Sequence, residues 1–110
     1  MIAIRVLLAM MLAILLAPTL IVSEAQAQSF NCRYARTADE VLICQDDELS
    51  TLDVRMSNSY FRLRNGIYGR RRAALESDKA AWLRSRMDCG RDRNCIADSY
   101  RQRIRELRDY

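Results

Sequence analysis

Residues 31–50, NCRYARTADEVLICQDDELS, place two cysteines around a helix-start signal. Thr37 and Glu40 have the spacing of a capping box, in which the threonine caps the helix and the glutamate reaches back to the chain before it. The stretch therefore predicts a short helix over residues 38–44. An isolated helix this short is only marginally stable in water, so we expect a covalent tether to hold it in place.

A long second helix is predicted to follow directly. Asp46 can cap it, and Asp47 and Glu48 then lie in its first turn, where the helix dipole favours negative charge. Beyond this start, apolar side chains recur at steps of three and four residues, which is the signature of one buried helical face. These are Leu49, Leu52, Met56, Tyr60, Leu63 and Ile67.

The Asn65-Gly66 pair and Gly69 are expected to end or bend this helix. A competing interpretation is a β-hairpin, because an Asn-Gly turn would lie here between two aromatic and apolar pairs. The helical interpretation is favoured, since the apolar face of the helix already accounts for Leu63 and Ile67.

Two further helices complete the pattern. Residues 71–87 are again helical in their spacing, and Gly90 is a plausible C-terminal cap. Asp92 can cap a last helix whose inner face holds Ile96, Tyr100, Ile104 and Leu107. The sequence thus predicts an all-α fold, a small antiparallel helical domain with two long helices and short flanking helices.

The N-terminal 27 residues have the pattern of a secretory signal peptide. Arg5 precedes an apolar run over residues 6–22, and Ala25-Gln26-Ala27 has the small residues of a cleavage site. The rival interpretation, an uncleaved membrane anchor, is less favoured because Pro18 interrupts the run. No cysteine stands at the cleavage point, so a lipid anchor is not expected. We therefore expect one helical domain over residues 28–110, in the periplasm or secreted.

The four cysteines all lie in this domain. An even number of cysteines in a short exported chain indicates disulfides. Three pairings are possible, and the local one is favoured because each pair is close in sequence. An all-thiolate zinc site is the rival, but neither spacing is the short one typical of zinc ligands. The favoured pairs are Cys32 with Cys44, and Cys89 with Cys95.

The composition argues against an enzyme. The chain has a net charge of +4 and no histidine, which removes the commonest general base and the commonest metal ligand. The carboxylates Glu76 and Asp78 are explained by an exposed helix face. Trp82 is interpreted as a core residue and not as a platform for sugar stacking. We predict no catalytic residue, no metal site and no cofactor.

Two charged clusters are the candidate partner-binding residues. The first is acidic and contains Asp46, Asp47, Glu48 and Asp53. The second is basic and contains Arg70, Arg71 and Arg72, which are suited to bidentate contacts with carboxylate or phosphate groups. Nucleic acid is not an expected partner, because the arginine run lacks the interleaved aromatic residues that stack on bases.

Four short motifs, in this order, make the chain resemble the LprI-type lysozyme-inhibitor domain family. They are F-x-C-x-x-A-R-T-x-x-E-x-x-I-C from Phe30, D-x-E-L-x-x-L-D from Asp46, A-W-L-x-x-R-x-x-C-G from Ala81, and C-I-x-x-x-Y-x-x-R-I-x-x-L from Cys95. The chain departs from the family at Asp47, where many members have proline, at residues 65–68, and in lacking the lipobox cysteine of the lipoprotein members. The resemblance implies an exported helical domain with two disulfides.

The same resemblance implies a function. We expect an exported binding module that inhibits lysozyme or a related peptidoglycan-cleaving enzyme. One alternative is a scaffold or accessory protein of the cell envelope without inhibitory activity. Another is a protein that binds anionic glycans or lipid headgroups through its arginines. The positive net charge disfavours long-range attraction to basic lysozymes, so inhibition would need either a local acidic face or an arginine that pairs with catalytic carboxylates.

Overall fold

The computed structural model describes residues 29–110; the predicted signal peptide lies outside this range. A 3-10 helix, η2 (Cys32–Tyr34), precedes four α-helices. These are α2 (Ala38–Gln45), α3 (Asp47–Gly66), α4 (Gly69–Asp88) and α5 (Arg93–Arg108). The all-α prediction is confirmed, and α5 is longer than the short flanking helix expected at this position. No helix in this range is long and apolar enough to cross a membrane.

The predicted helix caps are largely present. The Asp46 carboxylate accepts a hydrogen bond from the Leu49 N–H at 3.0 Å, and Asp92 accepts one from the Cys95 N–H at 3.1 Å. Thr37 occupies the cap position of α2, but its hydroxyl donates to Glu40 Oε1 at 2.8 Å. The hydrogen bond that a capping box places between the Thr37 side chain and the backbone is therefore absent, and the two predicted side chains bond to each other instead.

The chain reverses between α3 and α4 over two residues. Helix α3 runs through Asn65 to Gly66, so the alternative β-hairpin at this position is wrong. Gly69 begins α4 with a φ of +60°, and Gly90 follows the helix with a φ of +58°. Glycine is favoured at both points because it has no Cβ to oppose a left-handed backbone. The structure thus confirms Gly90 as the residue that ends the third predicted helix.

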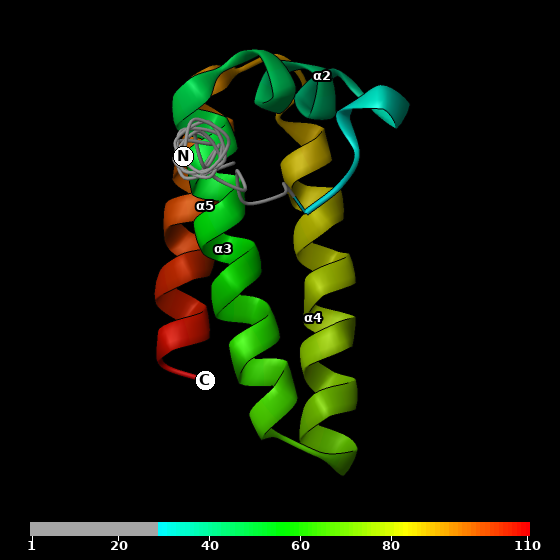
Figure 1. The fold of residues 1–110 in the computed structure, drawn as a ribbon, viewed down its shortest axis with the longest axis vertical. Helices are drawn as coiled ribbons and strands as arrows, with labels where there is room; N and C mark the ends of the chain where they lie inside the picture. The colour runs from blue at the N-terminus through cyan, green and yellow to red at the C-terminus, as the bar shows by residue number, and fades with distance from the viewer. Residues whose placement is uncertain (1–28) are drawn as a thin grey trace, which may run out of the picture.

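The helices form an open bundle in which α3 and α4 are antiparallel and α5 lies against α3 (Figure 1). Helix α2 crosses the end of the bundle where α3 begins and α4 ends. Helices α3 and α5 run in the same direction, because Arg93 at the start of α5 contacts Asp46 and Glu48 at the start of α3. Helices α3 and α4 meet at the opposite end, through the turn between them.

The core is built mainly between α2, α3 and α5. Both predicted inner faces contribute to it, and burial of one Leu or Ile side chain contributes about 1.5–3 kcal/mol. Helix α4 buries little of its surface apart from Leu75 and Arg86. The buried apolar residues are Ile43, Leu49, Leu52, Met56, Tyr60, Ile67, Leu75, Ile96, Ala97, Tyr100 and Leu107.

Two disulfides join the predicted pairs of cysteines. Cys32 is bonded to Cys44, which ties η2 and the entering chain to the end of α2. Cys89 is bonded to Cys95, which fixes the turn from α4 into α5. Both loops are short, so each bond is expected to stabilise the fold by about 2–3 kcal/mol through restriction of the unfolded chain.

Candidate functional site

The predicted acidic cluster begins α3 but is largely paired with arginines. Arg93 donates to Asp46 Oδ2 and to Glu48 Oε2, each at 2.6 Å, and Arg101 donates to Glu48 Oε1 at 2.5 Å. The hydrogen bonds from Arg93 lower the pKa of both carboxyl groups. Asp47 is exposed. The cluster therefore has little unpaired negative charge left to attract a basic partner.

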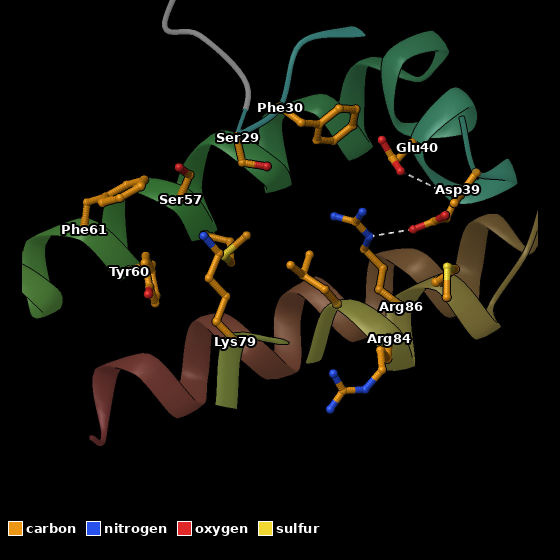
Figure 2. Close-up of a pocket in the computed structure, with 14 residues that line it drawn as sticks. Ser29, Phe30, Asp39, Glu40, Ser57, Tyr60, Phe61, Lys79, Arg84 and Arg86 are labelled. Carbon is orange, nitrogen blue, oxygen red and sulfur yellow. Dashed lines mark hydrogen bonds and ion pairs between the residues drawn. The ribbon is translucent and has the colours of Figure 1, made fainter. Parts of the chain in front are cut away.

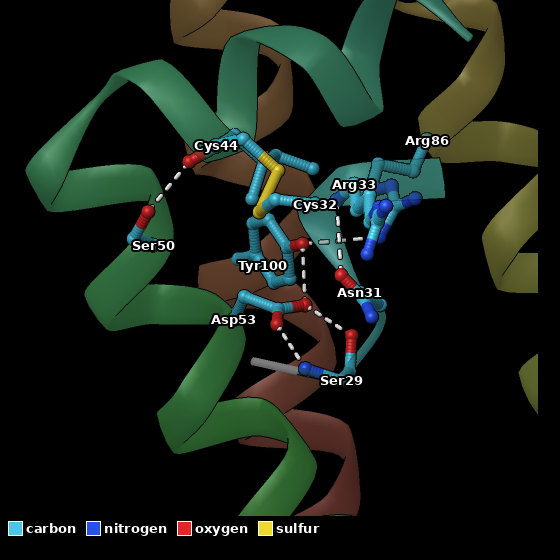
Figure 3. Close-up of a disulfide and its surroundings, with 10 residues drawn as sticks. Ser29, Asn31, Cys32, Arg33, Cys44, Ser50, Asp53, Arg86 and Tyr100 are labelled. Atoms are coloured by element: carbon cyan, nitrogen blue, oxygen red, sulfur yellow. Dashed lines mark hydrogen bonds between the residues drawn. A yellow bond between two sulfur atoms is a disulfide. The ribbon is translucent and has the colours of Figure 1, made fainter. Parts of the chain in front are cut away.

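Asp53 lies in the core and not on the predicted acidic surface. It is fully buried, because it lies on the same face of α3 as Leu49 and Met56. The N–H and the hydroxyl of Ser29 donate to its two oxygens at 2.6 Å each, and the Tyr100 hydroxyl donates to Oδ1 at 2.8 Å (Figure 3). A partner cannot reach this carboxylate in the folded protein, which removes Asp53 from the predicted docking face.

This carboxylate belongs to a buried polar network that the sequence did not reveal. Arg86 donates to the Tyr100 hydroxyl at 3.0 Å and to Asp39 Oδ2 at 2.7 Å. Burial raises the pKa of Tyr100, and the Asp53 carboxylate adds to the rise although Arg86 opposes it, so the phenol remains a donor. Burial alone would raise the pKa of Asp39, but the hydrogen bond and the charge of Arg86 hold it below its usual value.

The network links four helices and the entering chain. Asp39 is on α2, Asp53 on α3, Arg86 on α4 and Tyr100 on α5. A buried ion pair gains little over an apolar contact, but loss of one partner leaves an uncompensated charge. We therefore assign this network to the structure of the domain, where it sets the position of α4 relative to the other helices.

The three predicted arginines lie at the far end of the molecule from the acidic cluster. Arg70, Arg71 and Arg72 are in the first turn of α4, next to the end of α3. Helix α3 has 20 residues and is therefore about 30 Å long, so the two clusters cannot contact one partner side chain together. Arg71 Nη2 donates to the Tyr110 carbonyl at 3.4 Å, which brings the end of the chain to this turn.

A groove lies between α3 and α4 in the described part of the chain. It has a volume of about 320 Å³, within the size range of ligand sites. One wall is α3, the other is α4, and Phe30 and the start of α2 close one end (Figure 2). Its apolar lining consists of Phe30, Met56, Tyr60, Phe61, Leu83 and Met87.

Two side chains of the groove are large, apolar and exposed. Phe61 on α3 and Met87 on α4 each keep 47% of their surface in water. Lys79 lies beside the aromatic residues of α3, with Nζ 4.6 Å from the ring centroid of Tyr60 and 5.6 Å from that of Phe61. Within the described part of the chain no carboxylate lies within ion-pair distance of Lys79. The groove thus offers an apolar surface with two cations, Lys79 and Arg84, that have no ion-pair partner among the described residues.

Trp82 lies on the other side of α4, away from this groove. Its indole N–H donates to the Ser99 carbonyl at 3.2 Å, and its ring packs edge-on against Tyr100 with centroids 5.2 Å apart. It is half-buried and packs against the core, as the sequence predicted. Among residues 29–110 no cluster of three His, Cys, Asp or Glu side chains could hold a metal ion.

Comparison with known proteins identifies one similar group. The chain is 33% identical over 88 residues to lipoprotein LprI of Mycobacterium bovis and of two strains of Mycobacterium tuberculosis. The match covers 77% of this chain. The chain spans 43% of the length of those relatives. No family model matches, and no solved structure matches.

Proposed function

We propose that residues 28–110 form an exported binding module of the LprI type that inhibits a lysozyme or a related peptidoglycan-cleaving enzyme. The similarity to lipoprotein LprI carries this proposal, together with the family motifs that contain all four cysteines. The two disulfides support an oxidising compartment, since such bonds persist mainly outside the cytosol.

The groove between α3 and α4 is the surface that we assign to the enzyme. The acidic cluster is neutralised by Arg93 and Arg101, and the arginines of α4 would repel a basic lysozyme. The groove lies between these two regions. Exposed aromatic and Met side chains are enriched at protein interfaces, and Phe61 and Met87 supply them here.

The expected occupant is an apolar side chain of the enzyme next to a carboxylate. Peptidoglycan-cleaving glycosidases hold two carboxylates across their cleft, and one of them could pair with Lys79. Desolvated apolar contacts would supply most of the affinity, and Lys79 would select an enzyme surface with negative charge at this point. No catalytic step by this chain is involved.

The test is a titration of lysozyme activity on peptidoglycan with the oxidised domain. Saturable inhibition near one-to-one, lost on reduction of the disulfides, is the expected result. The double variant Phe61→Ala/Met87→Ala should weaken inhibition by at least about tenfold, as for truncation of central interface residues. The matched control Tyr34→Ala/Val41→Ala also removes exposed apolar side chains, but outside the groove, and should inhibit normally.

Two outcomes would contradict this proposal. If no class of lysozyme is inhibited, the module is better explained as an envelope scaffold or accessory protein. If the groove variant inhibits as well as the control variant, inhibition stands but the enzyme binds elsewhere. The same assay with Lys79→Gln, compared with Arg55→Gln on the exposed face of α3, tests the charge contact separately.

A further inference from the structure

The positive charge of this domain is concentrated at one end. We define the arginine tip as residues 62–72 and 105–110, where α3 ends, α4 begins and α5 ends. The tip contains seven arginines and two acidic residues, whereas the other described residues contain ten basic and eleven acidic side chains. The whole positive excess of the described chain therefore lies at the tip.

Most guanidinium groups of the tip have no ionic partner. Arg64 Nε pairs with Glu76 at 3.0 Å, but both side chains are substantially exposed. No other ion pair joins a tip arginine to a carboxylate in the described part of the chain. Arg71 donates to the main-chain oxygen of Tyr110 at 3.4 Å. The other tip arginines without an ion pair among the described residues are Arg62, Arg70, Arg72, Arg105 and Arg108.

Helix stability explains some of these arginines but not the three in α4. Arg64, Arg105 and Arg108 lie in the last turns of their helices, where the dipole favours positive charge. Arg70, Arg71 and Arg72 lie in the first turn of α4, where the dipole disfavours it. This turn has no acidic residue and no side-chain cap. The three positive charges at the start of α4 thus oppose the helix dipole. Such departures from local sequence preference are typical of functional sites.

The turn between α3 and α4 adds an exposed aromatic residue to this charge. Tyr68 keeps 78% of its surface in water, the largest value among the exposed apolar and aromatic side chains of residues 29–110. The turn is the outermost part of the bundle at this end (Figure 1). A protruding turn with a tyrosine beside arginines suits a flat anionic surface, because Tyr is favoured at the membrane interface and Arg binds phosphate groups in a bidentate manner.

We infer that the arginine tip docks on an anionic phospholipid surface. Long-range attraction depends on net charge, so the concentrated excess would orient the domain with the α3–α4 turn toward the lipid. The guanidinium groups would bind lipid phosphates, and Tyr68 would lie at headgroup level. This inference does not depend on the proposed inhibition of lysozyme, which uses the groove and not the tip.

The test is co-sedimentation of the oxidised chain from Gln28, which contains the whole described core and both disulfides, with lipid vesicles. We expect binding to phosphatidylcholine vesicles that contain phosphatidylglycerol and none to pure phosphatidylcholine. Binding should fall steeply as salt rises and screens the charges. Since each arginine near an anionic surface contributes about a fivefold gain in partitioning, the triple variant Arg70→Ala/Arg71→Ala/Arg72→Ala should lose on the order of 100-fold.

A matched variant distinguishes an effect of the arginine tip on vesicle binding from an effect of net charge alone. Arg33, Arg36 and Arg91 are exposed and lie at the opposite end, without ion pairs in the described chain. Their triple alanine variant has the same net charge as the tip variant and should keep most of the binding. Thermal melts of both variants verify that each is folded.

Three results would overturn the inference. The two triple variants could lose binding equally, which would show that net charge alone is responsible. Neutral and anionic vesicles could bind equally well. Finally, a soluble polyphosphate or anionic glycan could bind at the tip while vesicles do not, which would assign the tip to a polymer and not to lipid.

Discussion

At the scale of single residues, the buried polar network decides how the helices are fitted together. The four family-like sequence motifs contain Asp53, Arg86 and Tyr100. The roles of these residues depend on contacts between different helices. Asp53 was predicted to belong to the acidic partner-binding cluster with Asp46, Asp47 and Glu48. Its position four residues after Leu49, on the apolar face of α3, was the signal that it is buried.

Asp53→Asn should destabilise the domain without changing its shape. The substitution removes the charge that accepts from Ser29 and Tyr100 and places an amide donor against the Ser29 N–H. We expect the free energy of unfolding to fall by about 2–4 kcal/mol, as for a buried charged hydrogen-bond acceptor. Urea unfolding measures this change. Asp47→Asn, an exposed change in the same helix, is the control, and equal effects of the two would mean that Asp53 is not part of a buried network.

At the scale of helices, local sequence signals predicted the structure well. The caps at Asp46 and Asp92, the glycine after α4 and the disulfide pairs depend on residues close in sequence. The groove was not predictable in the same way. It exists because α4 buries little of its surface against α3, and no local pattern encodes the spacing between two helices.

The cap of α3 should make stability depend on acid pH. The hydrogen bond from Arg93 lowers the pKa of Asp46 below its ordinary 3.8. The folded state therefore binds fewer protons there than the unfolded state, and this contribution is present above pH 3.8 and lost as pH falls through the lower folded value. Asp46→Asn keeps a good cap but cannot titrate. Its unfolding free energy should fall less steeply between pH 5 and pH 2 than that of the wild type; parallel curves would contradict this assignment.

The start of α4 should gain stability when its arginines are replaced. Arg70→Glu places a negative charge where the helix dipole favours it, and we expect an increase of about 0.5–1 kcal/mol in the free energy of unfolding. Arg55→Glu, in the middle of α3, is the control and should change stability less. A rise in thermal midpoint for Arg70→Glu with a loss of vesicle binding would show that stability is sacrificed for function at this site. A lower midpoint would mean that Arg70 stabilises the helix.

Loss of the Cys32–Cys44 disulfide should have effects beyond those expected from the length of the loop that it closes. The length of its loop predicts that Cys32→Ser/Cys44→Ser lowers the free energy of unfolding by about 3 kcal/mol. The second bond closes a shorter loop, and its removal should lower the free energy of unfolding by about 2 kcal/mol. The first bond also holds the chain that carries Ser29 to Asp53. Hydrogen exchange of the Ser29 and Phe30 amides should therefore accelerate in this variant and not in Cys89→Ser/Cys95→Ser. Equal exchange in both would show that Asp53 holds the entering chain without help from the disulfide.

At the scale of the whole molecule, charge and shape divide the domain into different surfaces. The arginine tip carries the positive excess, and the groove between α3 and α4 lies beyond it, where basic and acidic side chains are nearly balanced. A domain held on lipid by its tip would leave the groove accessible to an enzyme. The two proposals are compatible, and each can fail without the other.

The central claim is that this domain binds a peptidoglycan-cleaving enzyme through its groove. Isothermal titration of lysozyme with the oxidised domain tests it most directly, with Phe61→Ala/Met87→Ala and Tyr34→Ala/Val41→Ala measured in parallel. The account predicts a one-to-one complex that is weakened at least about tenfold by the groove variant and unchanged in the control. Absence of binding to every lysozyme class, or an unweakened complex with the groove variant, would contradict it.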